Sequence, residues 1–182
     1  MRIPYVPDPP PVNSPEEQDI VDRIRHRRGE RGLTKLDLAL LHSPPVADGW
    51  NSFMDAIRNK SSLPAHLREL AICRVAVLLE ATYEWQAHSS IARASGISEE
   101  TLEALKSKSL DRHRFNEREL VVVDFVDAVV TQLRVPDEIM EALKREFTIQ
   151  QVLEFTVTVS AYITTAKTLT TLDIGEKNDQ PI

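Results

Sequence analysis

The 182-residue chain contains a single cysteine, Cys73, and no long apolar run. A lone cysteine excludes an internal disulfide, a Cys-x-x-Cys redox pair and a cysteine-rich metal site. The longest apolar segments span about ten residues, whereas a helix that crosses a bilayer needs roughly 20. The N-terminus has no apolar run after a basic start, so no secretory signal is expected. We therefore predict a cytoplasmic protein without a transmembrane helix.

An excess of basic charge is also missing. The formal net charge is -6, with acidic and basic residues mixed along the chain, which gives no footprint for nucleic-acid binding. A mass of 20.6 kDa and a hydrophobic content of 42% fit one globular domain with a real core. Glycine turns are absent where a β-hairpin would need them, and apolar residues recur at spacings of three and four. These features predict an all-α fold.

Three segments are expected along the chain. Residues 1–13 form an extended arm, because five prolines prevent a helix and favour a polyproline-like path. This arm either lies free or wraps around a neighbouring subunit. Residues 14–175 form a single helical domain, and residues 176–182 form a polar tail that is expected to fray.

Helix starts within the domain are marked by capping residues. They are Ser14 with Pro15 and Glu17, Ser43 with Pro44, Pro64, Ser98, Asn116 with Glu119, Pro136, and Thr148 with Gln151. In the helix after Ser43, the spacing of Val46, Trp50, Phe53 and Ile57 predicts a buried face.

The central stretch from Leu67 to Gly96 organises the domain. Its first part, residues 70–79, is apolar on every side of a helical wheel except at Arg74, which is typical of a helix buried all round. Its second part, residues 82–95, places Glu84 and His88 on one helical face. Glu69, in the first turn of the buried helix, starts a face that turns inward. Two carboxylates and one imidazole can therefore converge.

The runs RELAICRVA and YEWQAH in this stretch resemble the carboxymuconolactone decarboxylase family, whose fold is shared with alkylhydroperoxidase-D-like proteins. The resemblance implies a helical bundle of that type, assembled as a trimer or hexamer. In the redox branch the motif is Glu, eleven residues, Cys-x-x-Cys, three residues, His. Here Glu69 and His88 match its ends, Ala81 and Glu84 replace the two cysteines, and Tyr83 lies between them.

Without that cysteine pair, thiolate attack on a peroxide or disulfide has no nucleophile at the motif. The remaining side chains are proton carriers, and the decarboxylase branch of the family needs nothing more. We therefore predict a lyase, decarboxylase or isomerase that works without cofactor or metal on a small carboxylated, lactone or enolisable substrate. The predicted catalytic residues are His88, Glu84 and Glu69, and the predicted substrate-binding residues are Tyr83, Trp85 and Arg74.

Each of these residues also has a structural interpretation. His88 could be a core histidine bonded to a backbone carbonyl, and Glu84 could pair with Arg74 or Arg93. Glu69 could be no more than a negative charge in the first helical turn. Tyr83 and Trp85 could be packing or interface residues. Arg74 could bind a structural carboxylate. Glu69, Glu84 and His88 could also ligate a divalent ion, although a fourth ligand is missing.

Three classes of function therefore compete. The first is the cofactor-independent lyase or isomerase, which predicts a pocket of a few hundred Å³ with polar groups converging on His88. The second is a redox enzyme that depends on Cys73 or a bound metal. The third is a non-catalytic helical assembly unit, in which the core is closed and His88 is satisfied internally. A cavity that reaches His88 would separate the first class from the third.

Overall fold

The structure is a computed structural model that describes residues 1–176 and 181–182. Every regular element in this part of the chain is a helix, so the all-α prediction is confirmed. The elements are α1 (Pro15–Arg28), a 3-10 turn (Gly29–Arg31), α2 (Lys35–Leu40), α3 (Pro44–Asn59), α4 (Ala65–Leu78), α5 (Thr82–Ala94), α6 (Glu99–Leu105), a second 3-10 turn (Arg112–Arg114), α7 (Glu117–Thr131), α8 (Asp137–Glu146) and α9 (Ile149–Leu172). None of these helices is long and apolar enough to cross a membrane.

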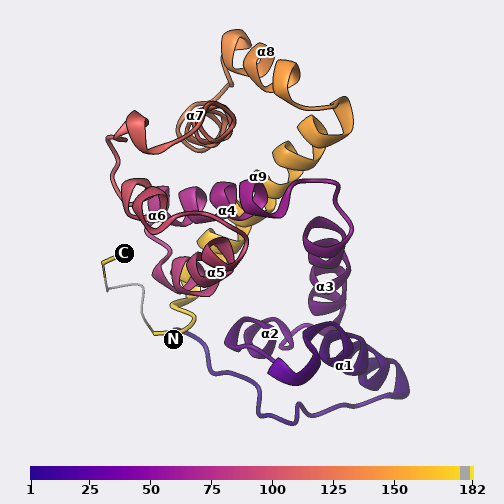
Figure 1. Cartoon of the computed structure of the whole chain (residues 1–182). Helices are drawn as coiled ribbons and strands as arrows, with labels where there is room; N and C mark the ends of the chain where they lie inside the picture. The colour runs from indigo at the N-terminus through magenta and orange to yellow at the C-terminus, as the bar shows by residue number, and fades with distance from the viewer. Residues whose placement is uncertain (177–180) are drawn as a thin grey trace.

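Helix α4 is the centre of the bundle. It contacts α5, α7 and α9, and Figure 1 shows these helices grouped around it. Every residue from Glu69 to Val77 is buried, which confirms the prediction of a helix without a solvent face. Since the apolar residues of α4 are buried on all its sides, they form the middle of the main hydrophobic core.

The turn between α4 and α5 brings the two halves of the central stretch together. Glu80 has a left-handed backbone with φ of 55°, and the Ala81 N–H donates to the Ala76 carbonyl at 2.8 Å. The Glu80 N–H donates to Val77 at 3.2 Å, which completes a Schellman motif. Glycine normally occupies such a position, so a glutamate there gives no sequence signal for this sharp turn.

Helices α1, α2 and α3 form a smaller lobe, at the lower right of Figure 1. The predicted buried face of α3 is partly wrong: Val46 and Phe53 are 54% and 46% exposed, while Ala47 and Asn51 are buried. The side of α3 that carries Ala47 and Asn51 is the side that packs in the lobe, where Asn51 accepts a hydrogen bond from α1. The apolar spacing of α3 indicates that one side of the helix is buried. It does not show that the side with Asn51 packs against α1, because that depends on a hydrogen bond from α1.

The arm of residues 1–13 does not lie free, because it packs on helices of its own chain. The Arg2 N–H donates to the Leu172 carbonyl at 2.8 Å, and the Val6 N–H donates to the Leu38 carbonyl at 3.2 Å. Figure 1 shows the arm crossing beneath α2 from the end of α9 to the start of α1. An extended chain leaves its backbone groups unpaired, and its own helices satisfy several of them here.

The predicted helix starts are confirmed with two corrections at the caps. Ser14 caps α1, but Glu17 accepts from the Asn13 N–H rather than closing a box with Ser14. Ser43 precedes α3 without a side-chain cap bond. Of the predicted polar tail, residues 177–180 lie outside the described residues, and Glu176 is held by hydrogen bonds from Tyr5 and Lys35 rather than frayed.

Candidate active site

A cavity of about 100 Å³ lies where α1, α3, α5 and α9 meet, and it reaches His88. Its polar lining includes Arg58, Tyr83, Glu84, His88, Tyr162 and Thr165. The cavity is smaller than the few hundred Å³ expected from the sequence. The non-catalytic class requires a closed core around His88. The cavity shows that the core is open at this residue.

His88 and Glu69 form a buried pair behind the cavity. His88 Nδ1 lies 2.7 Å from Glu69 Oε2, and the two residues are 6% and 1% exposed. The inward turn of Glu69 is therefore confirmed. Since α4 begins at Ala65 and has no acidic residue in its first turn, the interpretation of Glu69 as a helix-terminal charge is wrong.

The pair fixes the tautomer of the imidazole. Burial lowers the pKa of His88 below its usual 6.5, although the Glu69 carboxylate works in the opposite direction. Burial alone would raise the pKa of Glu69, but the His88 hydrogen bond and nearby cations bring that pKa below its usual value. At neutral pH the ring is therefore neutral, and its Nδ1–H donates to the carboxylate. Nε2, which makes no hydrogen bond with the described residues, keeps its lone pair and can act as a base.

Glu84 lies on the same cavity without a partner. It is 2% exposed, and neither carboxyl oxygen makes a hydrogen bond within the described part of the chain. The expected pairing with Arg74 or Arg93 is wrong, because Arg74 binds Asp127 and Arg93 binds Glu99. A buried polar group without a partner is costly, so such a group commonly marks a position where a ligand or water binds.

Glu84 is a proton donor in this environment. Burial raises the pKa of Glu84 well above its usual value of 4.5, because the apolar surroundings disfavour the carboxylate. The cavity thus holds a neutral carboxylic acid and a neutral imidazole side by side. Opposite shifts of this kind, upward for the carboxyl group and downward for the imidazole, favour the uncharged form of both groups, which is the form that a general acid and a general base need.

The buried acid predicts a pH-dependent stability. Above pH 4.5 the unfolded chain ionises Glu84 while the folded chain keeps its proton, so folding takes up a proton and the free energy of unfolding falls as pH rises, by up to about 1.4 kcal/mol per pH unit. Glu84→Gln removes this cost. We expect the variant to unfold at a higher temperature than the wild type at pH 8, with the gain vanishing toward pH 4.5. Thermal melts by circular dichroism would measure this, and parallel pH profiles for the two proteins would contradict it.

Tyr162 completes the cavity from α9. Its ring meets the His88 ring edge to face at 5.0 Å between centroids, and its buried hydroxyl makes no hydrogen bond with the described residues. Burial raises the pKa of Tyr162, so the phenol keeps its proton. The sequence places Tyr162 only among the core positions of α9, because nothing in its spacing signals that it faces the central stretch. Sequence inspection therefore missed Tyr162 as a functional candidate.

Tyr83 lines the cavity as well, and its ring packs against the backbone of Gly175. A Cβ atom at Gly175 would come within 2.1 Å of Tyr83 Cδ2, and φ at Gly175 is 90°, so glycine is required there. The cavity lining does not include Trp85 or Arg74. Trp85 packs in the core beneath the Lys106 ammonium, which lies 5.8 Å from its ring.

Arg74 has a structural position. Its guanidinium is fully buried and binds Asp127 through two hydrogen bonds of 2.6 and 2.9 Å. It also donates to the carbonyls of Leu105 and Ser107 at 2.8 and 2.7 Å. All of this side chain is used to join α4 to α7 and to the end of α6, so Arg74 is not available to a ligand in the cavity.

Neither a metal site nor a reactive thiol is assembled around the pair. In residues 1–176 and 181–182 no group of three or more His, Cys, Asp or Glu side chains is placed to hold a metal ion. Cys73 is fully buried on α4, and burial together with the nearby Glu69 and Glu84 raises the pKa of its thiol. A thiol in such surroundings is a poor nucleophile.

Solved structures with the same arrangement of helices are similar to the chain over most of its length. An uncharacterised peroxidase-related protein from Ralstonia eutropha, described as an alkylhydroperoxidase AhpD core, shares 16% identity over 95% of this chain and 90% of its own, with a TM-score of 0.74. An uncharacterised peroxidase-related protein from Silicibacter shares 15% identity over 98% and 96%, with a TM-score of 0.71. A protein of unknown function from Agrobacterium tumefaciens, linked by its name to AhpD and antioxidant defence, shares 19% identity over 72% and 90%, with a TM-score of 0.65.

These likenesses define the class of protein: a single-domain, all-α protein with the AhpD-like fold. The model of the carboxymuconolactone decarboxylase family matches residues 44–109, which span α3 to α6 and include Glu69, Glu84 and His88. The sequence resemblance to this family is confirmed over that segment. No curated protein matches the sequence significantly. Tyr162 and the α1 residues that line the cavity lie outside the matched segment.

Proposed function

We propose that the protein is a lyase or isomerase that moves protons on a small enolisable substrate, such as a lactone or a β-keto acid, without a cofactor. The observation that carries this proposal is the cavity itself, on which a neutral imidazole oriented by Glu69 and a neutral carboxylic acid at Glu84 lie together. Positioned acid–base groups of this kind typically contribute about 10² to 10⁴-fold to a rate.

In the proposed reaction, Nε2 of His88 takes a proton from the carbon next to a carbonyl. The electron pair of the broken C–H bond moves into the carbonyl, and the oxygen that becomes negative accepts hydrogen bonds from the hydroxyls of Glu84 and Tyr162. In an unsaturated substrate the enolate is a conjugated dienolate, and His88 then delivers the proton to the γ-carbon at its far end, which yields an isomer with the double bond shifted. The Glu69 carboxylate stabilises the imidazolium that exists between the two steps.

Decarboxylation needs the same groups. The bond between the carboxylate and the adjacent carbon breaks, CO₂ leaves, and its bonding electrons form the same enolate. Glu84, whose pKa is raised by burial, donates a proton to that carbon and regains one from solvent afterwards. The orphaned oxygens of Glu84 and Tyr162 support this scheme, because a substrate oxygen would satisfy them.

A peroxidase-like redox enzyme is the competing function, and the names of the similar solved structures favour it. Against it stand the residues at the two cysteine positions of the redox motif, Ala81 and Glu84. The remaining cysteine, Cys73, is fully buried, and its pKa is raised. A thiolate at the cavity is therefore unsupported.

One set of assays separates the two functions. Unsaturated lactones and β-keto acids are screened for CO₂ release and for isomerisation, beside a peroxide consumption assay, with wild type and Cys73→Ala. We expect turnover in the first screen that Cys73→Ala retains, with a stability loss of about 1 kcal/mol or less. Peroxide turnover that disappears in folded Cys73→Ala would overturn the proposal in favour of redox chemistry.

A homo-oligomer, as a trimer or hexamer, and a cytoplasmic location stay predictions. The arm gives no support for assembly, since it packs on its own chain. Support comes from the exposed apolar side chains of Val46 and Phe53 on α3 and of Ile149 and Leu153 on α9. Exposed apolar residues on adjoining helices are common at subunit interfaces, and light scattering would give the mass directly.

A further inference from the structure

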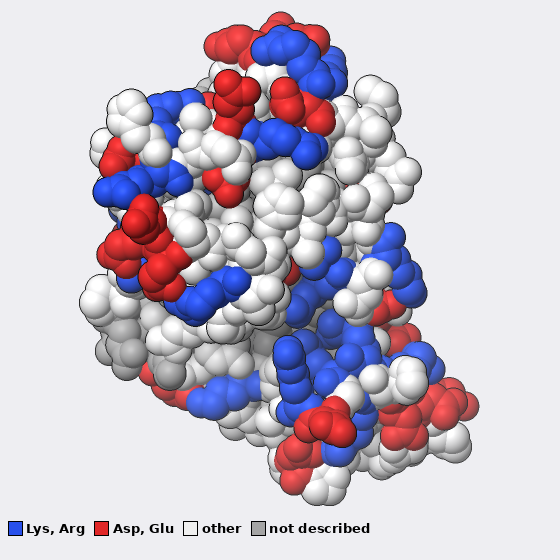
Figure 2. Space-filling view, viewed as in Figure 1, with Lys and Arg blue, Asp and Glu red and all other residues white. Residues whose placement is uncertain are grey.

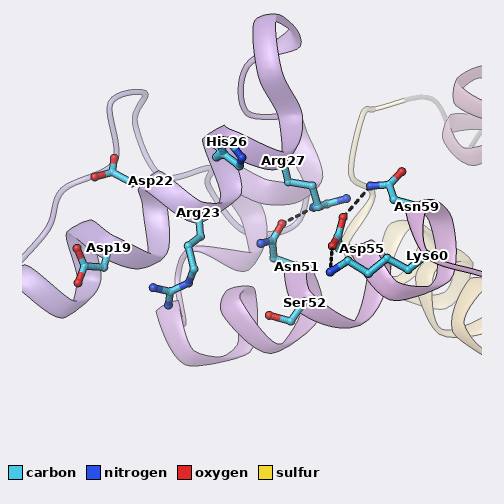
Figure 3. Close-up of a pocket in the computed structure, with 10 residues that line it drawn as sticks. All are labelled: Asp19, Asp22, Arg23, His26, Arg27, Asn51, Ser52, Asp55, Asn59 and Lys60. Carbon is cyan, nitrogen blue, oxygen red and sulfur yellow. Dashed lines mark hydrogen bonds and ion pairs between the residues drawn. The ribbon is translucent and has the colours of Figure 1, made fainter.

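A second and larger concavity lies beside the cavity. It is an open groove of about 720 Å³ between α1 and α3, and Figure 3 shows that polar side chains from both helices line it. Among the described residues, Arg27 is the one that lines both the groove and the cavity. Its side chain therefore forms part of the partition between an open vestibule and the space beside His88.

Arg27 is held in this partition by a neutral partner. Its Nε donates to Oδ1 of Asn51, as the dashed line in Figure 3 marks, and no carboxylate pairs with it in the described chain. Burial lowers the pKa of Arg27, and the neighbouring cations Arg28 and Arg58 lower it further, while the carboxylates of Asp37 and Asp55 act in the opposite direction. A half-buried guanidinium whose hydrogen-bond partner is only an amide would gain from an anion more than an ion-paired arginine would.

The positive charge around Arg27 lies on its cavity side, where Arg28 and Arg58 line the wall, whereas Asp19, Asp22 and Asp55 line the groove side together with Arg23 and Lys60. Arg28 is neutralised by Asp37, which it binds through two hydrogen bonds of 2.7 Å. Arg58 also lines the cavity, and it makes no hydrogen bond or ion pair with the described residues. Figure 2 shows basic side chains gathered in the hollow between the α1–α3 lobe and the body of the molecule. The two uncompensated guanidiniums at the cavity are thus Arg27 and Arg58.

The small size of the cavity also indicates that a substrate reaches beyond it. A volume of about 100 Å³ corresponds to roughly three water molecules, whereas pockets for small-molecule ligands typically hold about 300–1,000 Å³. A substrate with more than a few heavy atoms must therefore extend through the mouth of the cavity or displace part of its wall. The Arg27 side chain is the natural wall, because its displacement would join the cavity to the groove.

We propose that Arg27 is the gate between the groove and the cavity, and that Arg27 and Arg58 together bind a carboxylate or phosphate group of the substrate there. The anion replaces Asn51 as the partner of Arg27, and the rest of the substrate extends toward His88. This inference rests on the proposed function for its substrate, but its binding step requires no turnover. It assigns a recognition role to a residue of α1, which lies outside the segment that matches the family.

The binding step can be followed on the two tryptophans of the chain, because Trp50 lines the cavity and Trp85 does not. The ¹⁵N-labelled full chain is titrated at constant ionic strength with inorganic phosphate, with succinate, and with neutral succinamide. We expect saturable shifts of the Trp50 indole signal with one or both anions and none with succinamide, while the Trp85 signal stays in place. The stronger anion identifies the acidic group that the site prefers. Failure of both anions to shift Trp50 would overturn the proposal.

Arginine variants assign the ligands. Arg27→Ala and Arg58→Ala should each weaken anion binding at least tenfold, and Arg27→Lys should weaken it less. Arg25→Ala, on the exposed side of the same helix, is the matched control and should bind like the wild type. An unshifted Trp85 signal shows that each variant is folded. Wild-type affinity in Arg27→Ala or Arg58→Ala would overturn the assignment.

The gate is tested at Asn51. Asn51→Asp gives Arg27 an ionic partner that competes with the anion, so phosphate binding should weaken at least tenfold, whereas Asn51→Ala frees Arg27 and should bind at least as well as the wild type. Equal affinities in both variants would show that Arg27 does not gate the cavity.

His88→Ala separates this inference from the proposed function. The variant should lose turnover and keep the Trp50 shift, while loss of both would contradict a separate anion site.

Discussion

Replacing His88 by alanine is expected to lower turnover by about 10² or more on the substrate that the screen identifies, while helix content is retained. The imidazole carries the proton in the proposed reaction, and among the described residues no other histidine lines the cavity. Steady-state kinetics and far-ultraviolet circular dichroism measure the two quantities. His113→Ala is the matched control, because that histidine lies exposed on a 3-10 turn and should give wild-type rates.

The pH profile adds a second readout. Because the pKa of His88 is lowered and that of Glu84 is raised, wild-type activity should fall at acidic pH as His88 gains a proton, and at alkaline pH as Glu84 loses one. Glu69→Gln leaves an acceptor for Nδ1 but removes the charge that stabilises the imidazolium, so it should lower turnover less than His88→Ala does. Near-normal turnover in folded His88→Ala would make His88 structural and move the proton to Glu84 or Tyr162.

The central stretch could be predicted from the sequence because its signals are local. The buried character of α4 follows from an uninterrupted apolar run, and the shared face of Glu84 and His88 follows from helical spacing alone. The sequence predicts that Glu69, Glu84 and His88 converge, but it does not show which carboxylate bonds to His88. That depends on how α5 folds back on α4, and the turn that sets this, at Glu80, contains no glycine that would mark it in the sequence.

The rest of the cavity could not be predicted, because its residues come from helices far apart in the chain. Tyr162 on α9 and Arg58 on α3 look like a core position and an ordinary surface cation when each helix is considered alone. Only packing shows that both face the space beside His88. For the same reason, the partner of Arg74 could not be predicted. The sequence indicates that this buried cation needs an anion, but it does not indicate that Asp127, far along the chain, provides it.

The Arg74–Asp127 contact matters to the candidate site because α4 carries Glu69 in the same helix. Arg74 is fully buried, and it joins α4 to α7 and to the carbonyls that follow α6. Hydrogen bonds to carbonyl groups do not neutralise the charge of a guanidinium. When its carboxylate is removed, the charge stays buried and uncompensated, which is among the most costly single changes in a folded protein.

Asp127→Ala should therefore lower the free energy of unfolding by about 3 kcal/mol, near the lower end of the range for breaking a buried pair, because the Asp127 side chain itself is partly exposed. Asp124→Ala is the matched control on the same helix. Asp124 also binds an arginine, Arg112, through two hydrogen bonds, and its side-chain exposure of 37% resembles the 32% of Asp127, but Arg112 is 55% exposed and Arg74 is not exposed at all. The control should cost less than about 1 kcal/mol. Urea unfolding at equilibrium measures both, and equal losses in the two variants would show that burial of Arg74 does not set the strength of its pair.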